Sequence, residues 1–380
     1  MDQATWEHLM ANVQSQFRAA HPQSDLTAVA GQFGKPLVVL VHGIGGDARH
    51  WSNPTAIDTA VTWLFDLDAV PPPISSGITI TQSPAYPANA VTTWCQALTN
   101  QQISYINWSQ SAPEDCLDIA VQELVAILQM VEGQLFGPLT QDTSNTGPLP
   151  ALILLCHSRG GLVARAALKQ IGKAGVPHLQ KIITLSTPHH GSYMPKLSSD
   201  YDTTLRHFLD FSHVAGQIPA WLVPAQLGQA LTTLAGKVSA SLLRTFGAPG
   251  QGPGFGELVP DSDTMRDLAA NEQPLPGVQY IGYGGSNPIF VKFYLNVVHW
   301  TPPGIPTASP TIVDQLTRAI PNVATKYGNL AELALGDSAV SLGSSQWPAQ
   351  FNATYQSLPF NHMQALINTN LQQAVLDAIH

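Results

Sequence analysis

One stretch of the sequence constrains the fold more than any other, because an apolar run passes directly into a helix rich in small residues. Residues 152–156 are aliphatic apart from Cys156, and Ser158, Arg159 and two glycines follow before the helical pattern begins. A serine between a buried strand and a helix N-terminus sits on a sharp turn, where glycines let the two backbones pass closely. The stretch therefore predicts a strand, a tight turn and a helix, with an accessible hydroxyl on the turn.

Ser158 is the candidate nucleophile of this turn. In the motif G-x-S-x-G the serine lies two residues after one glycine and two before another, and Gly160 satisfies the second condition. Cys156 stands where the first glycine is expected, so the prediction depends on the flanking strand and helix as well as on the motif. The alternative is that Ser158 merely caps the helix, as serines often do.

A second apolar run predicts the loop that would receive a developing oxyanion. Residues 37–41 are all Leu or Val, which is typical of a strand buried on both faces of a parallel sheet, and they lead into His42, Gly43, Ile44 and two glycines. Backbone amides exposed in such a loop can donate to an oxyanion, together with the amide after the nucleophile. We expect Ile44 and Arg159 to supply these amides.

A serine nucleophile needs a histidine base and an acid, and chain order selects them among thirteen histidines. When the order is serine, acid, histidine, His362 fits the base, in a loop before the closing helix, and Asp337 fits the acid, on a glycine turn. The alternatives are that Asp337 is only a turn residue and His362 only a polar loop residue. The rival acids are Asp261, Asp263 and Asp314.

Other residues near these motifs are predicted to line the site without taking part in proton transfer. They are His42, Gly43, His157, His189 and His190.

Together these motifs resemble the α/β-hydrolase lipases, particularly bacterial triacylglycerol lipases and lecithin:cholesterol acyltransferase-like proteins. The resemblance is carried in the first half of the chain by residues 39–43, 157–161 and 185–192. In the second half, residues 336–340 are similar to the family's G-D-G-x-V acid turn, and residues 361–363 are similar to its N-H-L histidine loop. It implies an α/β-hydrolase fold: a mostly parallel central sheet, helices on both faces and an inserted helical cap. It also implies an esterase or lipase whose substrate is a small ester or a lipid.

The same resemblance bears on metals. In calcium-bound bacterial lipases an aspartate follows the histidine by two positions, and Gln364 stands there in this chain. The sequence also lacks an H-E-x-x-H pattern, and the adjacent His189 and His190 do not by themselves make a ligand set. We therefore expect no required metal and no cofactor.

The 380 residues are expected to form one catalytic domain, 1–380, with two insertions. Residues 192–257 carry apolar helical faces without a strand pattern, and they are predicted to form a cap or lid that can contact a lipid interface. A static cap and a mobile lid fit this pattern equally well. Residues 286–327 form the second predicted insertion.

Charge and composition exclude some partners. A formal charge of −9 and the lack of a basic cluster argue against nucleic acid. The apolar run 289–300 is short and contains Lys292, so no transmembrane segment is expected there. The first residues lack a signal-peptide pattern, which leaves the location open. Of the three cysteines, Cys95 and Cys116 can pair only in an oxidising compartment.

These patterns lead to one preferred function and two alternatives. The preferred function is hydrolysis of carboxylic esters by a Ser-His-Asp triad through an acyl-enzyme. An acyltransferase or amidase would need the same residues and differ only in acceptor or leaving group. A non-catalytic binding module on a hydrolase scaffold is the third hypothesis.

Overall fold

The structure of this chain is a computed structural model. It describes in full residues 2–54, 92–140, 149–195, 252–287, 336–337 and 339–380, and the backbone alone of residues 77–82, 141 and 293–298. Most of the predicted cap, 192–257, and of the second predicted insertion, 286–327, lies outside the described residues. Within that second stretch, β8 (Phe293–Val298) pairs antiparallel with β3 (Gly77–Gln82) in a sheet of two strands.

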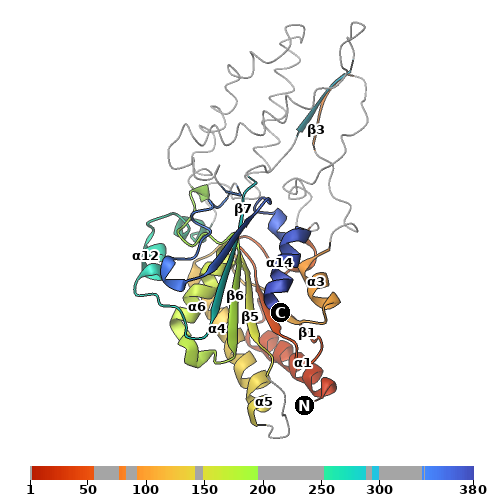
Figure 1. Cartoon of the computed structure of the whole chain (residues 1–380), viewed down its shortest axis with the longest axis vertical. Helices are drawn as coiled ribbons and strands as arrows, with labels where there is room; N and C mark the ends of the chain where they lie inside the picture. The colour runs from red at the N-terminus through yellow and green to blue at the C-terminus, as the bar shows by residue number, and fades with distance from the viewer. Residues whose placement is uncertain are drawn as a thin grey trace.

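A second sheet of seven strands forms the centre of the molecule, in the order β1-β4-β2-β5-β6-β7-β9 (Figure 1). From β4 to β9 the neighbouring strands are parallel, and β1 pairs antiparallel with β4 at one edge. The strands are β1 (Asp25–Val29), β2 (Leu37–Val41), β4 (Ser104–Ser109), β5 (Leu152–His157), β6 (Leu179–Leu185), β7 (Gln279–Gly285) and β9 (Thr354–Leu358).

Helices cover both faces of this sheet, which explains why its central strands are apolar throughout. Every residue of β2 and β5 is buried, and their side chains alternate between two hydrophobic clusters. One cluster packs under α1 (Gln3–Ala20), α4 (Leu117–Met130) and α6 (Arg159–Gly175). The other packs under α3 (Trp94–Asn100) and α14 (Thr369–Ile379). This arrangement confirms the predicted fold class.

Apolar residues recur at helical spacing from Trp6 to Phe17, which predicts an amphipathic helix, and α1 confirms this prediction. Asp2 caps it by accepting a hydrogen bond from the Thr5 amide at 2.8 Å, and its apolar face is buried against the sheet. The buried residues of that face are Trp6, Met10, Val13 and Phe17. The helix therefore forms part of the core.

Residues 114–135 have a helical pattern that Gly137 and Pro138 follow, which predicts a helix with these bounds and a stop at those two residues. The structure gives the helix different bounds. It begins later, at Leu117, and continues past Met130 as a π-helical turn, Val131–Phe136, and then as α5, Gly137–Gln141. The predicted stop at Gly137 and Pro138 is wrong. Gly137 adopts ordinary right-handed helical angles, and a proline in the first turn of a helical segment needs no hydrogen-bond donor there.

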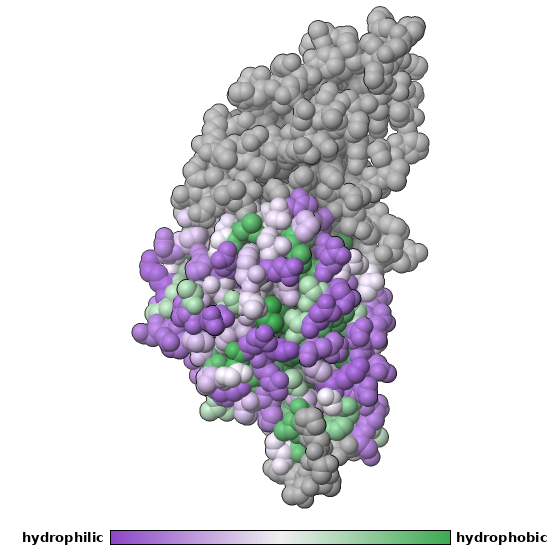
Figure 2. All heavy atoms as spheres, viewed as in Figure 1, coloured by the Kyte–Doolittle hydropathy of each residue, from purple (hydrophilic) through white to green (hydrophobic). Residues whose placement is uncertain are grey.

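Residues Leu117–Thr140 form one helical stretch of the described chain that is long and apolar enough to cross a membrane. In the structure, 56% of the most apolar 18 residues of this stretch are buried, and α4 packs against α6 and α1. This burial is that of a core helix. Among the described residues, Ile119 is the large hydrophobic side chain that is exposed, and the visible face of the described part is mainly hydrophilic (Figure 2).

A buried ion pair joins α6 to the chain beyond α12 (Asp263–Ala269). Arg165 donates two hydrogen bonds to the Glu272 carboxylate, at 2.9 and 2.5 Å, and both side chains are at least 95% buried. We expect Glu272→Gln to destabilise the fold by about 3–5 kcal/mol, because it leaves a buried guanidinium without its counter-charge. Urea unfolding followed by circular dichroism measures this free energy.

The matched control for this prediction is Asp25→Asn, which breaks the exposed pair of Arg18 and Asp25 and should change stability little. The double variant Arg165→Met/Glu272→Leu should recover much of the lost stability, since it removes both charges together. A Glu272→Gln protein as stable as the wild type would contradict the prediction.

Candidate active site

Ser158 follows the last residue of β5, and its backbone takes an unusual conformation there. Its angles are φ 53° and ψ −130°, in a region that L-residues rarely occupy, and α6 begins at the next residue. This is the strained strand-to-helix turn that the sequence predicts. The Ser158 side chain makes no capping hydrogen bond to α6, so the capping alternative does not describe its position.

Two glycines allow the turn to pack against neighbouring strands. A Cβ atom at Gly160 would lie 2.3 Å from the carbonyl oxygen of Val41, and one at Gly161 would lie 2.2 Å from Oγ1 of Thr187. Both distances are too short for a side chain. The close approach of α6 to β2 and to the loop after β6 therefore requires glycine at these two positions.

The structure brings Ser158, His362 and Asp337 together, although 204 residues separate Ser158 from His362. Ser158 Oγ lies 2.9 Å from His362 Nε2, and His362 Nδ1 lies 2.9 Å from Asp337 Oδ2. Ser158 directly follows β5, and His362 lies in the loop after β9. Asp337 lies on a turn beside the last residue of β7, where a Cβ atom at Gly285 would be 2.7 Å from Cβ of Asp337. All three residues are more than 90% buried.

A tight turn holds the Asp337 carboxylate. Its Oδ1 accepts hydrogen bonds from the amides of Ala339 (3.0 Å) and Val340 (2.7 Å), which leaves Oδ2 for His362. The Asp337 amide donates to the carbonyl of Val340, and the Asp337 carbonyl accepts from the His362 amide at 3.1 Å. The acid turn and the histidine loop are thus joined by backbone as well as by side chain.

The side chains around the histidine loop fix its shape in ways that the sequence did not indicate. Asn361 Oδ1 accepts from the amides of Met363 and Gln364, and Gln364 Oε1 accepts from the Asn361 amide. The Asn-His sequence before a helix was the available signal, because asparagine often closes such a turn with its side chain. Gln364 therefore has a structural role in this loop.

The rival acids lie elsewhere. Asp261 is exposed on a turn with φ 64°, and Asp263 is exposed in the first turn of α12, where it pairs with Arg266. Asp314 lies outside the described residues. Of the candidate acids that the structure describes, Asp337 is the one in contact with His362.

The loop predicted to supply an oxyanion donor lies against the nucleophile. A Cβ atom at Gly43 would be 2.9 Å from Cβ of Ser158, so residues 42–44 pass directly over the turn. The His42 ring fixes the conformation of this loop through two hydrogen bonds. Its Nδ1–H donates to the Gly43 carbonyl at 2.8 Å, and its Nε2 accepts from the Gln110 amide at 3.0 Å. The roles of the Ile44 and Arg159 amides remain predictions.

Three histidines form a buried cluster beside the triad. Ring centroids are 6.0 Å apart for His42 and His50, and 6.4 Å apart for His50 and His157. His157 donates from Nε2 to the His362 carbonyl at 3.0 Å, and the two rings lie 4.8 Å apart. Burial lowers the pKa of His42 to about 3 and of His50 to about 4, and it also lowers the pKa of His157. All three are therefore neutral at pH 7.

This cluster predicts loss of stability in acid. Between pH 6.5 and about 4 the unfolded chain binds protons at these histidines while the folded chain does not, so the free energy of unfolding falls as the pH falls. The slope is up to about 1.4 kcal/mol per pH unit for each histidine. Urea midpoints at pH 7 and pH 4.5 measure it. His50→Phe should reduce the slope, and the exposed control His8→Gln should not.

His189 and His190 do not contact the triad. His189 is buried against Trp347, with ring centroids 4.1 Å apart, and its Nε2 lies 3.2 Å from Thr184 Oγ1. His190 is exposed, and its amide donates to Ser344 Oγ. The structure thus places His42, Gly43 and His157 next to the triad, and His189 in a separate aromatic cluster.

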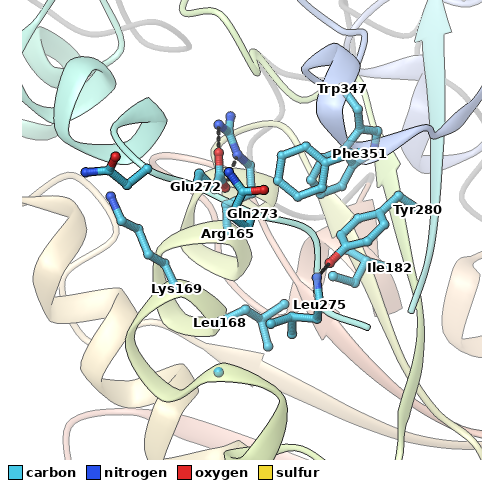
Figure 3. Close-up of a pocket in the computed structure, with 12 residues that line it drawn as sticks. Arg165, Leu168, Lys169, Ile182, Glu272, Gln273, Leu275, Tyr280, Trp347 and Phe351 are labelled. Atoms are coloured by element: carbon cyan, nitrogen blue, oxygen red, sulfur yellow. Dashed lines mark hydrogen bonds and ion pairs between the residues drawn. The ribbon is translucent and has the colours of Figure 1, made fainter. Parts of the chain in front are cut away.

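A cavity of about 190 Å³ lies beside that aromatic cluster (Figure 3). Lys169 and the ion pair of Arg165 and Glu272 line one side of it, and Tyr280, Trp347 and Phe351 line the other. None of its lining residues belongs to the triad. The cavity is therefore separate from the chemistry proposed for Ser158.

The described part of the chain contains no candidate metal site and no disulfide bond. Its residues contain no group of three or more His, Cys, Asp or Glu side chains able to hold a metal ion. Cys95, Cys116 and Cys156 are all free thiols, so the pairing of Cys95 with Cys116 is not formed.

Comparison with a family model supports the fold. Residues 87–209, about a third of the chain, match the family described as PGAP1-like alpha/beta domain. This stretch contains β4, β5 and the turn at Ser158, but neither Asp337 nor His362. No curated protein matches the sequence.

Solved structures similar to the chain include hydrolases of several kinds. One is the mature form of lipase BlEst2 from Bacillus licheniformis, 16% identical over 94% of this chain and 97% of that one, with a TM-score of 0.49. The metagenomic carboxyl esterase MGS0156 is 13% identical over 92% and 76%, with a TM-score of 0.39. An epoxide hydrolase from metagenomes of hot environments is 12% identical over 94% of each chain, with a TM-score of 0.38.

What identifies the chain is its own strand order, the strained serine turn after β5 and the match over residues 87–209. The protein has an α/β-hydrolase fold and is similar to the PGAP1-like alpha/beta domains in the part of the chain that forms the serine turn.

Proposed function

We propose that this protein is a serine hydrolase that cleaves carboxylic esters. The observation that carries the proposal is the continuous hydrogen-bonded chain from Ser158 Oγ through His362 to Asp337 Oδ2. A serine hydroxyl is a weak nucleophile at neutral pH, and a neutral imidazole within hydrogen-bond distance activates it. The proposal assigns the roles of nucleophile, base and orienting acid to these residues in that order.

The proposed reaction begins with the tautomer that the contacts favour. The Asp337 carboxylate accepts the Nδ1 proton of His362, which leaves the Nε2 lone pair facing the Ser158 hydroxyl. Ser158 Oγ bonds to the ester carbonyl carbon while its proton passes to Nε2. The carbonyl oxygen becomes an oxyanion, which the amides of Ile44 and Arg159 are proposed to receive.

The proposed second half of the reaction returns the enzyme to its starting state. The tetrahedral intermediate collapses, the bond to the alcohol oxygen breaks, and the Nε2 proton goes to the leaving alcohol. Water then gives a proton to the same nitrogen and attacks the acyl-enzyme, and a second collapse releases the carboxylic acid and restores the Ser158 hydroxyl. The proposal requires no metal or cofactor.

The experiment that tests this function combines covalent labelling with a substrate series. A fluorophosphonate probe should label Ser158, identified by mass spectrometry of the peptide, and p-nitrophenyl esters should be hydrolysed. Comparison of short and long acyl chains separates a short-chain esterase from a lipase. Absence of both labelling and turnover would reject the hydrolase and favour a binding module. Product analysis with added alcohols or amines tests the acyltransferase alternative, and amide substrates test the amidase alternative.

The proposed partner is a small ester or a lipid, which fits the absence of a basic cluster and the formal charge of −9. Contact with a lipid interface through residues 192–257 is part of the same proposal. Vesicle flotation with phosphatidylcholine vesicles tests it.

A further inference from the structure

The side chain of Arg159 is buried beside the candidate nucleophile, where the carboxylates of Glu257 and Asp115 partly compensate its charge. It is fully buried directly after the candidate nucleophile, and within the described residues it makes no ion pair with a carboxylate. Burial lowers its pKa only to about 10, so the guanidinium is charged at pH 7. A buried charge costs free energy unless its surroundings compensate for it.

The guanidinium donates to two oxygens on the segment that follows β4. Nη1 donates to the Asp115 carbonyl at 2.6 Å and Nη2 donates to Gln110 Oε1 at 3.2 Å, while Nε is buried and has no hydrogen-bond partner among the residues that the structure describes. Arg159 thus connects the start of α6 to residues 110–115. Through Gln110 this connection extends to the loop that follows β2.

Gln110 passes this connection on to the loop that carries Ile44. Its side-chain Nε2 donates to the His42 carbonyl at 3.1 Å, and its backbone amide donates to His42 Nε2 at 3.0 Å. His42 in turn donates to the Gly43 carbonyl. A continuous chain of hydrogen bonds therefore runs from the Arg159 side chain to the peptide next to Ile44.

We propose that the Arg159 side chain is a positioning residue for the oxyanion site, which it builds by fixing the loop of Ile44 against the start of α6 through Gln110 and His42. The inference depends on the proposed function, because it concerns the two amides that would receive the oxyanion. Amides that are held in place before the reaction stabilise a developing charge without reorganisation. Arg159 then contributes its backbone amide to the oxyanion site, and its side chain sets the distance between that amide and the amide of Ile44.

A purely structural role makes a different prediction. The guanidinium also packs against Gly254, where a Cβ atom would lie 2.3 Å from Nη1, and the Gly254 amide donates to the Glu114 carbonyl. If Arg159 only anchors this contact, its replacement should lower stability without a specific effect on transition-state binding.

The test uses Arg159→Met, which keeps the backbone amide, and Gln110→Leu, which breaks the chain at its middle. Each should lower kcat by about 10- to 100-fold with p-nitrophenyl esters and change KM by less than about threefold. Affinity for an alkyl boronic acid, whose tetrahedral serine adduct places an oxygen in the oxyanion site, should fall by a similar factor. The double variant should lose little more than either single variant, because the two residues act as one unit.

The matched control is Arg165→Met, which truncates another buried arginine of α6 that has no contact with Gln110 or His42. It should lower stability and leave kcat and boronic-acid affinity near wild type. If Arg159→Met does not fold, Gln110→Leu alone decides. Wild-type kcat and boronic-acid affinity in a folded variant would overturn the proposal. An inactive, unlabelled wild-type protein would instead reject the proposed function.

Discussion

Replacement of Ser158 by alanine should lower kcat for ester hydrolysis by about a millionfold, leaving only the residual catalysis that substrate binding and the oxyanion donors supply. The change removes only one oxygen atom, so the acyl-enzyme cannot form while the buried turn keeps its neighbours. His362 Nε2 loses its 2.9 Å contact with the serine hydroxyl. Steady-state kinetics with p-nitrophenyl esters measure the loss, and circular dichroism and urea unfolding check the fold.

Ser186 provides a matched control for this experiment. It is buried, it follows β6 with φ 50°, and its Oγ has no hydrogen-bond partner in the described part of the chain. Ser186→Ala therefore makes the same chemical change at another residue with a strained backbone. Because Ser186 is not one of the reacting residues, kcat should stay within about twofold of wild type. Full activity in Ser158→Ala would end the assignment of the nucleophile.

Replacement of Asp337 by asparagine should lower kcat by about ten-thousandfold with the fold intact. In the structure Oδ1 accepts from two backbone amides, so the asparagine amide oxygen is expected to take that position and its NH₂ group to face His362 Nδ1. A donor facing Nδ1 makes that nitrogen the acceptor and moves the imidazole proton to Nε2. The histidine then cannot accept the Ser158 proton.

The control for Asp337→Asn is Asp263→Asn, which makes the same change in an exposed acid that was a rival for this role. It should leave kcat unchanged. An Asp337→Asn enzyme within tenfold of wild type would mean that the carboxylate neither orients nor stabilises the imidazole, and another acid would have to be sought.

The sequence could predict those parts of the site that depend on local pattern and chain order. The apolar run before Ser158 is short and leads into a turn, which favours a buried strand, and Gly160 and Gly161 after the turn are required by close contacts that no larger residue permits. The positions of Asp337 and His362 followed from the order of the motifs. Their mutual distances could not be predicted, because they depend on packing between segments that are far apart in the chain.

Other features depend on tertiary contacts that the sequence does not encode locally. Gly137 and Pro138 look like a helix stop, but proline is tolerated at the start of the next helical segment. The chain from Arg159 through Gln110 to His42 joins three segments, none of which has a motif for it. His189 is predicted from its motif to line the site, yet its ring packs on Trp347, with centroids 4.1 Å apart.

The attachment of the acid turn has a consequence for how the acid and the base respond to change. Asp337 is joined to the residues just after it through the amides of Ala339 and Val340, and to the histidine loop through both its carboxylate and its backbone carbonyl. A displacement of the acid turn would therefore carry His362 with it, so the two residues are expected to keep their mutual geometry and to shift together relative to Ser158.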